Sequence, residues 1–339
     1  MAISYTPVDI RGNAVESIIE EILYANKTIA DGYVVFNDNI KANTIISEGS
    51  VAVTAQLYTG AALSSSGSMT VTDRAVTPTK LEYKQTFLEE SLRTSRFNRD
   101  MKPGAWNIES NEFASKVLAM VGPNVSEDAE SIFWGGITAA TKVSIAALTP
   151  GAGQLAITAA TQTAVAALTA GLVDGVFAKV LYDNAAVGQY VKVTGTTVTS
   201  ANIAAEMAKI YAAIPANVLN NTVSPVVVYC PRAWKQLAYT ANNAVGAAQQ
   251  INFVITGDSF GKSKVFYNGI EMLFVPTPNA LMAYATCMDA ISWNTDLVDD
   301  VTRFEVGKVA NDGDTKFVRS IYTMAAHVTR ATLGVLYGG

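Results

Sequence analysis

Residues 51–76 decide the predicted fold, and they read VAVTAQLYTGAALSSSGSMTVTDRAV. Apolar residues alternate with small or polar ones, cleanly from Val51 to Leu57 and less cleanly from Met69 to Asp73. Such alternation is typical of β-strands, and the Gly/Ser-rich stretch between the two runs is typical of a turn. A long two-stranded hairpin is marginally stable alone in water, so this one is predicted to need a surface to lie on.

Helical and extended segments flank this hairpin. Upstream, residues 13–30 space apolar side chains at helical intervals with glutamates between them, which predicts a short amphipathic helix. Downstream, residues 77–92 predict an extended stretch followed by a short helical turn. The chain therefore enters the hairpin from a helix and leaves it as an extended segment.

A helix is predicted over residues 107–121 and is interrupted by Gly122 and Pro123, because proline lacks a backbone donor and clashes with the preceding turn. A second helix is predicted to begin at Ser126, whose hydroxyl can cap it, and to end at Gly135 and Gly136.

The second half of the chain mixes helices and strands. Residues 138–170 are low in complexity, and we interpret them as a lobe boundary followed by a buried helix through about Leu181. A helix capped by Ser200 is predicted to stop at Pro215. Further elements follow from local patterns: a strand at 223–230, a helix from Pro231, a hairpin at 264–275 turning at Asn268 and Gly269, and a strand-rich remainder. The fold class is α+β with mixed or antiparallel sheet.

Composition favours a structural subunit. Half of the 339 residues are hydrophobic and only 16% are charged, which is low for a monomer that faces water over its whole surface. The net charge of -5, with no basic block, argues against direct wrapping by nucleic acid. No apolar run approaches the length of a membrane span, and the start does not resemble a secretion signal, so we expect assembly in the cytoplasm.

The sequence offers little for catalysis, and we predict no catalytic, cofactor-binding or metal site. His327 is the single histidine and lies in an alternating stretch typical of a strand. Cys230 and Cys287 each lie in an apolar run, as buried free thiols do. Residues 151–156, GAGQLA, match a dinucleotide-binding pattern with Asp174 at the ribose position, but Pro150 and the low-complexity flanks favour a linker.

Several charged residues have structural interpretations. Residues 311–314, NDGD, are predicted to form a hairpin turn rather than a calcium loop, because no glutamate follows at the required position. The acidic group Glu127, Asp128 and Glu130 is predicted to be a solvated face or a partner for basic residues on other subunits, as are the acidic pairs Glu20/Glu21 and Glu89/Glu90. Lys41, Lys80 and Lys84 are interpreted as ordinary surface charge.

The order of these elements resembles the major capsid proteins of tailed bacteriophages of the Hong Kong 97 type. The matching stretches are the hairpin at 50–76, the segment 77–92, the helix pair ending FWGG at 133–136, VVVYCPRAWKQL at 226–237, and YNGIEMLFVP at 267–276. The likeness covers most of the chain and is one of element order and local character, because this family has no sharp motif.

The resemblance implies a Hong Kong 97-type capsid fold. It implies an N-terminal arm over 1–49, an extended loop (the E-loop) over 50–76, a peripheral domain with a spine helix over 77–137 and 293–339, and an axial domain over 138–292. Gly122 and Pro123 would kink or split the spine helix, which departs from the family. No long charged coiled coil precedes the arm, so a fused scaffolding segment is not expected.

A capsid role implies a virion protein whose main partners are other copies of itself in pentamers and hexamers. Portal, scaffolding or decoration proteins are further expected partners, and packaged DNA is expected to make only weak contact. The alternatives are an encapsulin-type shell around cargo, a subunit of a tail or surface array, and an enzyme that uses the 151–156 loop.

Overall fold

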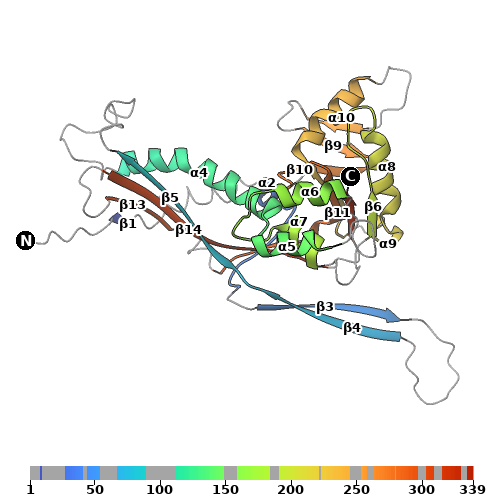
Figure 1. Ribbon diagram of the computed structural model, residues 1–339, viewed down its shortest axis with the longest axis horizontal. Coiled ribbons are helices and arrows are strands. Elements are labelled where there is room, and N and C mark those ends of the chain that lie inside the picture. The colour runs from blue at the N-terminus through green and yellow to red at the C-terminus, as the bar shows by residue number, and fades with distance from the viewer. Residues whose placement is uncertain are drawn as a thin grey trace, which may run out of the picture.

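The structure is a computed structural model that describes 14 stretches of the chain: residues 8–9, 27–40, 44–53, 67–88, 111–148, 159–183, 191–220, 223–244, 253–257, 263–278, 280–296, 303–308, 315–329 and 334–338. These stretches form an elongated body with two sheets and a separate two-stranded ribbon (Figure 1). The two sheets belong to two lobes, and the ribbon extends below both lobes in that view.

The first lobe is built on β14, which runs from Thr315 to Val328. It pairs antiparallel with three strands: β5 (Thr79–Leu88), β13 (Arg303–Lys308) and β12 (Ile291–Asn294). Two short strands lie at the ends of this sheet, β1 (Val8–Asp9) beside β13 and β2 (Val35–Asn37) beside β12. β5 confirms the predicted extended stretch and carries it through Leu88, because β14 offers its backbone a ladder of hydrogen bonds. Residues 89–92, the rest of the segment predicted to end in a helical turn, lie outside the described residues.

A single helix, α4, runs from Asn111 to Gly135 along this lobe. The predicted interruption at Gly122 and Pro123, and the predicted helix start at Ser126, are wrong. Pro123 is exposed, whereas Val121, Val125, Phe133 and Trp134 are buried. A proline inside a helix costs about 3 kcal/mol, and each large apolar side chain fully buried returns about 1.5–3 kcal/mol, so packing outweighs the break.

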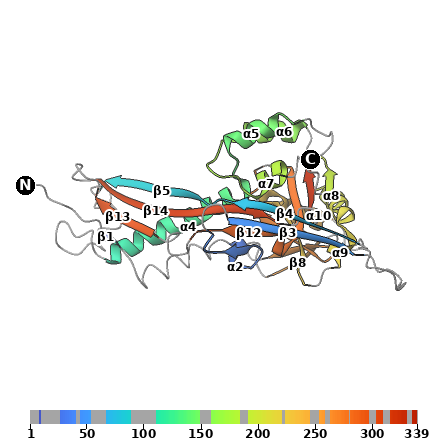
Figure 2. The ribbon, with the colours of Figure 1, turned by 90° about the horizontal axis from the view of Figure 1, so that it is seen from below.

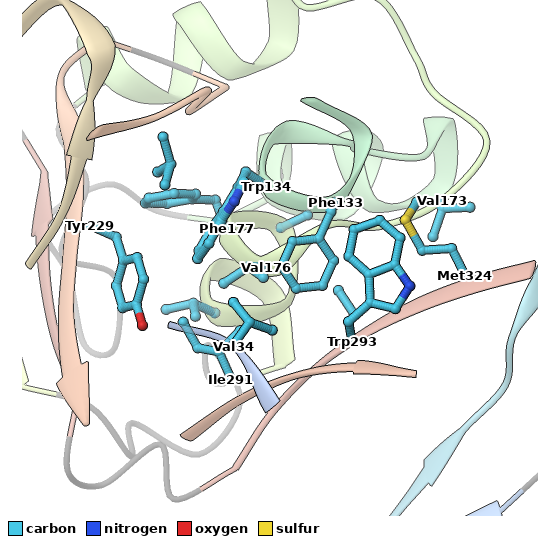
Figure 3. Close-up of a cluster of buried hydrophobic side chains, with 14 of the residues drawn as sticks. Val34, Phe133, Trp134, Val173, Val176, Phe177, Tyr229, Ile291, Trp293 and Met324 are labelled. Carbon is cyan, nitrogen blue, oxygen red and sulfur yellow. The ribbon is translucent and has the colours of Figure 1, made fainter. Parts of the chain in front are cut away.

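The core of the first lobe lies where α4 ends. Phe133 stacks on Trp293 of β12 at 4.6 Å between ring centroids, and Trp134 contacts Tyr229 at 4.8 Å. Figure 3 shows these rings together with residues of α7 (Val176–Asp183) and Met324 of β14. The predicted buried helix through Leu181 is therefore confirmed as α7.

The low-complexity segment before α7 contains two short helices, α5 (Ala139–Ala146) and α6 (Ala159–Ala167), which composition alone did not predict. They lie above α7 in Figure 2 and pack against each other. Polar side chains join them: Lys142 donates to the Leu168 carbonyl, and the Gln162 amide donates to the Ile145 carbonyl at 2.7 Å.

The second lobe is a seven-stranded sheet with helices packed against it. Its strand order is β6-β15-β11-β7-β10-β9-β8. The strands are β6 (Val191–Thr194), β7 (Val226–Pro231), β8 (Phe253–Thr256), β9 (Lys264–Tyr267), β10 (Ile270–Val275), β11 (Met282–Cys287) and β15 (Val335–Gly338). The short 3-10 helix η2 (Met288–Ala290) links β11 to β12 of the first lobe.

The helices of this lobe are α8 (Ile203–Ala213), α9 (Ala216–Leu219) and α10 (Arg232–Ala244). The predicted apolar stripe of α8 is confirmed, since Ile203, Met207 and Ile210 are buried. The predicted cap by Ser200 is wrong, because the N-cap is Asn202, whose side-chain oxygen accepts from the Thr199 amide at 2.6 Å. This hydrogen bond closes the loop between Thr199 and Asn202, and the helix begins after it, at Ile203.

The predicted hairpin at 264–275 is confirmed. Asn268 and Gly269 have φ angles of 47° and 83°, which suit the tight turn between antiparallel strands. The second lobe thus holds a short hairpin within a wide sheet, whereas the ribbon stands apart from both sheets.

The ribbon consists of β3 (Thr44–Val53) and β4 (Gly67–Val76), which confirms the predicted hairpin and starts it earlier, at Thr44. Most of the predicted tip, 54–66, lies outside the described residues. Of the predicted helix at 13–30, only α2 (Lys27–Ala30) is described.

Candidate functional site

One face of the ribbon is largely apolar, and it also holds Ser47 and Asp73, whose side chains hydrogen bond to each other. The register sets Ile45 opposite Ala75, Ser47 opposite Asp73 and Val51 opposite Met69. Because directly opposed residues in an antiparallel pair share a face, Ile45, Met69, Val71 and Ala75 lie on one side. We call these four residues the ribbon face.

The ribbon face is uncovered within the chain. Ile45 is 62% exposed, Met69 71% and Val71 54%, and Ala75 is exposed as well. In the described chain the two strands pair only with each other. Large apolar side chains grouped on one exposed surface mark an interaction site in a folded protein, so this face is the candidate functional site.

The root of the ribbon is fixed to the first lobe. Val76 at the end of β4 is 3% exposed, and after two intervening residues the chain enters β5 on β14. Upstream of the ribbon, the Ile40 amide donates to the Thr295 carbonyl at 2.9 Å, beside β12. Both ends of the ribbon are therefore attached to the same sheet, and only the part beyond them projects.

The segment before the ribbon also binds α4. The Thr28 hydroxyl donates to Glu130 at 3.2 Å, and Arg232 of α10 pairs with Glu127 at 3.0 Å and with Glu130 at 3.3 Å. The prediction that this acidic group is a solvated face or binds other subunits is wrong for Glu130, which is buried and binds Arg232 and Thr28 of its own chain. Glu127 is exposed, as predicted, although it also pairs with Arg232. Asp128 is exposed on the same helix.

A second polar cluster joins the same segment to the second lobe. The Tyr33 hydroxyl donates to Glu271 and accepts from Lys264 at 2.8 Å, while Lys264 pairs with Glu271 at 3.0 Å. Burial, followed by the hydrogen bond to Glu271, raises the pKa of Tyr33 to about 12. Hydrogen bonds with Tyr33 and Glu271 raise the pKa of Lys264, so its amine stays charged at neutral pH. Residues 27–40 thus hold both lobes against the root of the ribbon.

The histidine and the two cysteines, whose side chains could serve in catalysis or metal binding, do not form a site. His327 lies in β14 and is buried, and Cys230 and Cys287 are buried free thiols, as predicted. Burial raises the pKa of the Cys230 thiol, which keeps it protonated and poorly reactive. The structure brings none of these three together with an acid or base that the sequence had singled out.

The dinucleotide-binding pattern at 151–156 lies outside the described residues, but its proposed ribose acid does not. Both carboxylate oxygens of Asp174 are engaged within the chain: one accepts from the Thr138 amide and the other from the Thr141 hydroxyl, each at 2.7 Å. Asp174 therefore fastens the start of α5, which is a structural role.

The remaining predicted sites are surface features or undescribed. Lys80 and Lys84 are exposed on β5, and the Lys84 amine lies 6.0 Å from the centre of the Phe317 ring. Lys41 and residues 311–314 lie outside the described residues, although β13 and β14 on either side of 311–314 pair antiparallel. Within the described stretches, no group of His, Cys, Asp or Glu is placed to hold a metal, and no helix is long and apolar enough to cross a membrane.

Sequence reasoning missed a buried carboxylate in the second lobe. Glu206 of α8 is 4% exposed, accepts from Lys209, Tyr337 and Thr196 at 2.8–2.9 Å, and holds α8 against β15. Burial raises its pKa, but the three hydrogen bonds more than offset burial and leave the pKa below its usual range. The sequence carried a partial signal, because Glu206 interrupts the apolar stripe of α8.

The fold matches chains from solved phage structures, two of which are of a procapsid or capsid. A chain of the satellite phage P4 procapsid, solved with its size determination (Sid) protein, matches with a TM-score of 0.57 and 13% identity over 100% of this chain and 94% of that chain. Mycobacterium phage Ogopogo gives 0.51 and 10%, covering 100% and 97%. A capsid chain of cyanophage A-1(L) gives 0.50 and 14%, covering 99% and 96%.

By sequence, no family model and no curated protein matches the chain. The structural likeness therefore rests on three-dimensional arrangement, at identities of 10–14%. It extends over nearly the whole of both chains in each case. The predicted capsid-type α+β fold is confirmed.

Proposed function

We propose that this chain is a major capsid protein that assembles as pentamers and hexamers into an icosahedral shell around a phage double-stranded DNA genome. The observation that carries the proposal is the ribbon face, an apolar surface on a projecting ribbon that the chain itself leaves uncovered. A fold shared with chains of phage capsid structures supports it. The proposed role is structural, without catalysis.

In this proposal the first lobe is the peripheral domain, α4 is the spine helix, and the ribbon is the extended loop. Sheet pairing supports three refinements of the boundaries expected from sequence. The extended loop begins at Thr44, where β3 begins, and residues 334–338 belong with the axial domain, because β15 lies in the second sheet. Residues 138–290 otherwise remain the axial domain in this proposal, with α7 packed into the core of the first lobe, and Ile291 and Ser292 move to the peripheral domain because they begin β12.

The proposed mechanism is the covering of each ribbon face by a neighbouring copy. Removing apolar surface from water contributes about 25 cal/mol per Å², so one ribbon contributes a modest amount. Closed symmetry repeats that contact around every capsomer, and the repeated contacts together hold the shell. Portal, scaffolding or decoration proteins are further proposed partners, and the net charge of -5 favours only weak contact with DNA.

The test is expression of the chain, alone and with any scaffold from the same genome, followed by negative-stain electron microscopy. Closed icosahedral particles are expected. Tubes or flat sheets would favour a tail or surface-array subunit, and closed particles around a cargo protein with no packaged DNA would favour an encapsulin. A protein that stays a small monomer under all assembly conditions would contradict the proposal.

A matched pair of substitutions tests the ribbon face itself. Met69→Asp introduces a charge on the ribbon face, whereas Ser68→Asp introduces the same charge at the adjacent exposed position, whose side chain points to the other side. Loss of particles with Met69→Asp and retention with Ser68→Asp is expected, with both subunits keeping their circular dichroism spectra. Equal assembly of the two variants would remove the ribbon face from the mechanism.

A further inference from the structure

A single carboxylate lies within the apolar side of the ribbon. Asp73 of β4 falls between Val71 and Ala75 on that side, directly opposite Ser47, whose hydroxyl donates to it at 2.5 Å. Asp73 is exposed, and no ion pair within the described stretches neutralises it. When the ribbon face is covered, this carboxylate loses water, and an unpaired buried carboxylate is costly. The covering surface therefore has to bring a cation to Asp73.

The sheet of the first lobe has one packed side and one open side. Val318 and Tyr322 of β14 are buried in the core that α4 also lines. The alternate residues Phe317, Arg319 and Ile321 point to the other side and are half-buried, and the residues of β5 directly opposite them are exposed. We call this side of β5 and β14 the open face, and its residues include Lys80, Glu82, Lys84, Phe317, Arg319 and Ile321.

The open face is rich in positive charge. Lys84 lies directly opposite Arg319, and like charges at directly opposed positions of a sheet repel each other. Glu82 pairs with Arg319 at 2.6 Å, and it is the one carboxylate that β5 and β14 place on this side, against three cations with Lys80. A carboxylate from another chain would relieve the repulsion between Lys84 and Arg319, so the open face suits an acidic side chain.

The spacing of side chains on the two surfaces matches. Each strand alternates apolar and charged residues on the relevant side: Val71, Asp73 and Ala75 on β4, and Phe317, Arg319 and Ile321 on β14. Facing sheets pack with their strands nearly aligned, so Asp73 can meet Arg319 while its apolar neighbours meet apolar side chains. A slide of two residues, about 7 Å, would place the carboxylate on Phe317 or Ile321. Only one position along the strands pairs the charges.

The open face that receives the ribbon belongs to another copy of the chain. β4 passes into β5 through Thr77 and Pro78, and Val76 before them is buried, so the root of the ribbon is fixed. Figure 1 shows the ribbon pointing away from β5. To reach its own open face, the ribbon would have to reverse its direction across those two residues. Two different surfaces of one chain meeting between copies make a heterologous contact, the kind that closes rings.

We infer that Asp73 sets the register of the ribbon on a neighbouring copy by pairing with Lys84 and Arg319 of that copy's open face. The inference rests on the proposed function and names the surface that covers the ribbon face. The apolar residues of the ribbon face provide the attraction, and the carboxylate selects the position along the strands.

Charge reversal with a matched control tests the pairing. Asp73→Lys and Lys84→Glu should each lower the yield of particles by at least about tenfold, and the double variant should restore it to within about twofold of wild type. The control combines Asp73→Lys with Lys80→Glu, the same charge change on the same side of β5, and should not restore assembly. All three positions are exposed, so circular dichroism should show folded subunits. A double variant that assembles no better than Asp73→Lys alone overturns the inference.

Cross-linking of the wild-type assembly locates the contact directly. A carbodiimide joins a carboxylate to an amine that touches it, taking up the water that is lost, so peptide mapping should find an amide between Asp73 and Lys84 of different copies. Lys84→Arg keeps the charge and cannot form the amide, so it should assemble without this link. Icosahedral particles without the link overturn the inference and leave the capsid proposal intact. Tubes or sheets with the link do the reverse, and a chain that stays monomeric overturns both.

Discussion

The two hairpins of this molecule share a pattern and differ in what covers them. In β9–β10, Val265, Tyr267, Ile270 and Met272 are all at most 7% exposed, because β7, β8 and the helices enclose them. In the ribbon, Ile45, Met69 and Val71 are more than half exposed. Alternating apolar residues thus form a strand pair in both places, but only one pair is part of a core within its own chain.

The difference shows that a period of two predicts strands and one apolar face, not what that face contacts. For β9–β10 the covering surface is the same sheet and its helices. For the ribbon it must come from elsewhere, because a two-stranded ribbon is marginal alone and an exposed apolar face favours association. The following substitutions test this distinction.

Two methionines provide the largest contrast. Met272→Ala in β10 leaves a cavity in a packed core and is expected to lower the free energy of unfolding by about 2–5 kcal/mol. Met69→Ala on the ribbon face is expected to change it by less than about 0.5 kcal/mol. Urea unfolding of the isolated subunits measures both. Similar losses for the two variants would mean that the ribbon is packed within its own chain in solution.

The contrast also explains which parts of the fold the sequence predicts. Local signals predicted the ribbon, the turn at Asn268 and Gly269, and the stripe of α8, because each is set by neighbouring residues. The continuity of α4 through Pro123 was not predictable from the local rule, because it depends on apolar partners such as Trp293 that are distant in sequence.

The two buried glutamates were also hard to predict, because their partners are distant in sequence. Glu130 binds Arg232, 102 residues away, and Glu206 binds Tyr337, 131 residues away. No short window of sequence contains both partners, so Glu130 was indistinguishable from a solvated residue, and Glu206 was marked only by its position in the apolar stripe of α8. The candidate site itself was half predictable: the alternation identified Met69 and Val71 but missed Ile45, which precedes the stretch that was recognised.

Acid should weaken the second lobe, where β9–β10 lies, through Glu206. Its pKa is lowered in the folded chain, so its contribution to stability is present above the unfolded pKa of 4.5 and is lost as pH falls through the folded value. Glu206→Gln leaves buried partners poorly matched and should cost about 1–3 kcal/mol at pH 7. Its unfolding free energy should also fall less steeply below pH 4.5 than that of the wild type, as followed by urea titration. Parallel pH profiles would contradict the assignment.

The tight turn of β9–β10 is expected to contribute less to the free energy of unfolding. A Cβ at Gly269 would meet nothing within 4 Å, so Gly269→Ala tests only the left-handed backbone, with φ at 83°. A loss of about 1 kcal/mol is expected, measured by urea unfolding. Asn268→Gly is the control, since glycine adopts the same conformation freely, and it should be near neutral. A neutral Gly269→Ala would show that the turn is not held in this geometry.

The smallest effect is expected at the ion pair between Glu82 of β5, the strand into which the ribbon continues, and Arg319 of β14. The Arg319 Nε lies 2.6 Å from Glu82 Oε1, and the two side chains are 36% and 46% exposed. Exposed pairs are screened by water and salt, so Glu82→Gln should cost between 0 and about 1 kcal/mol, less at high salt. Urea unfolding at low and high ionic strength measures this. If the same substitution reduced particle yield while the subunit kept its stability, the strand after the ribbon would share the interface with the ribbon face.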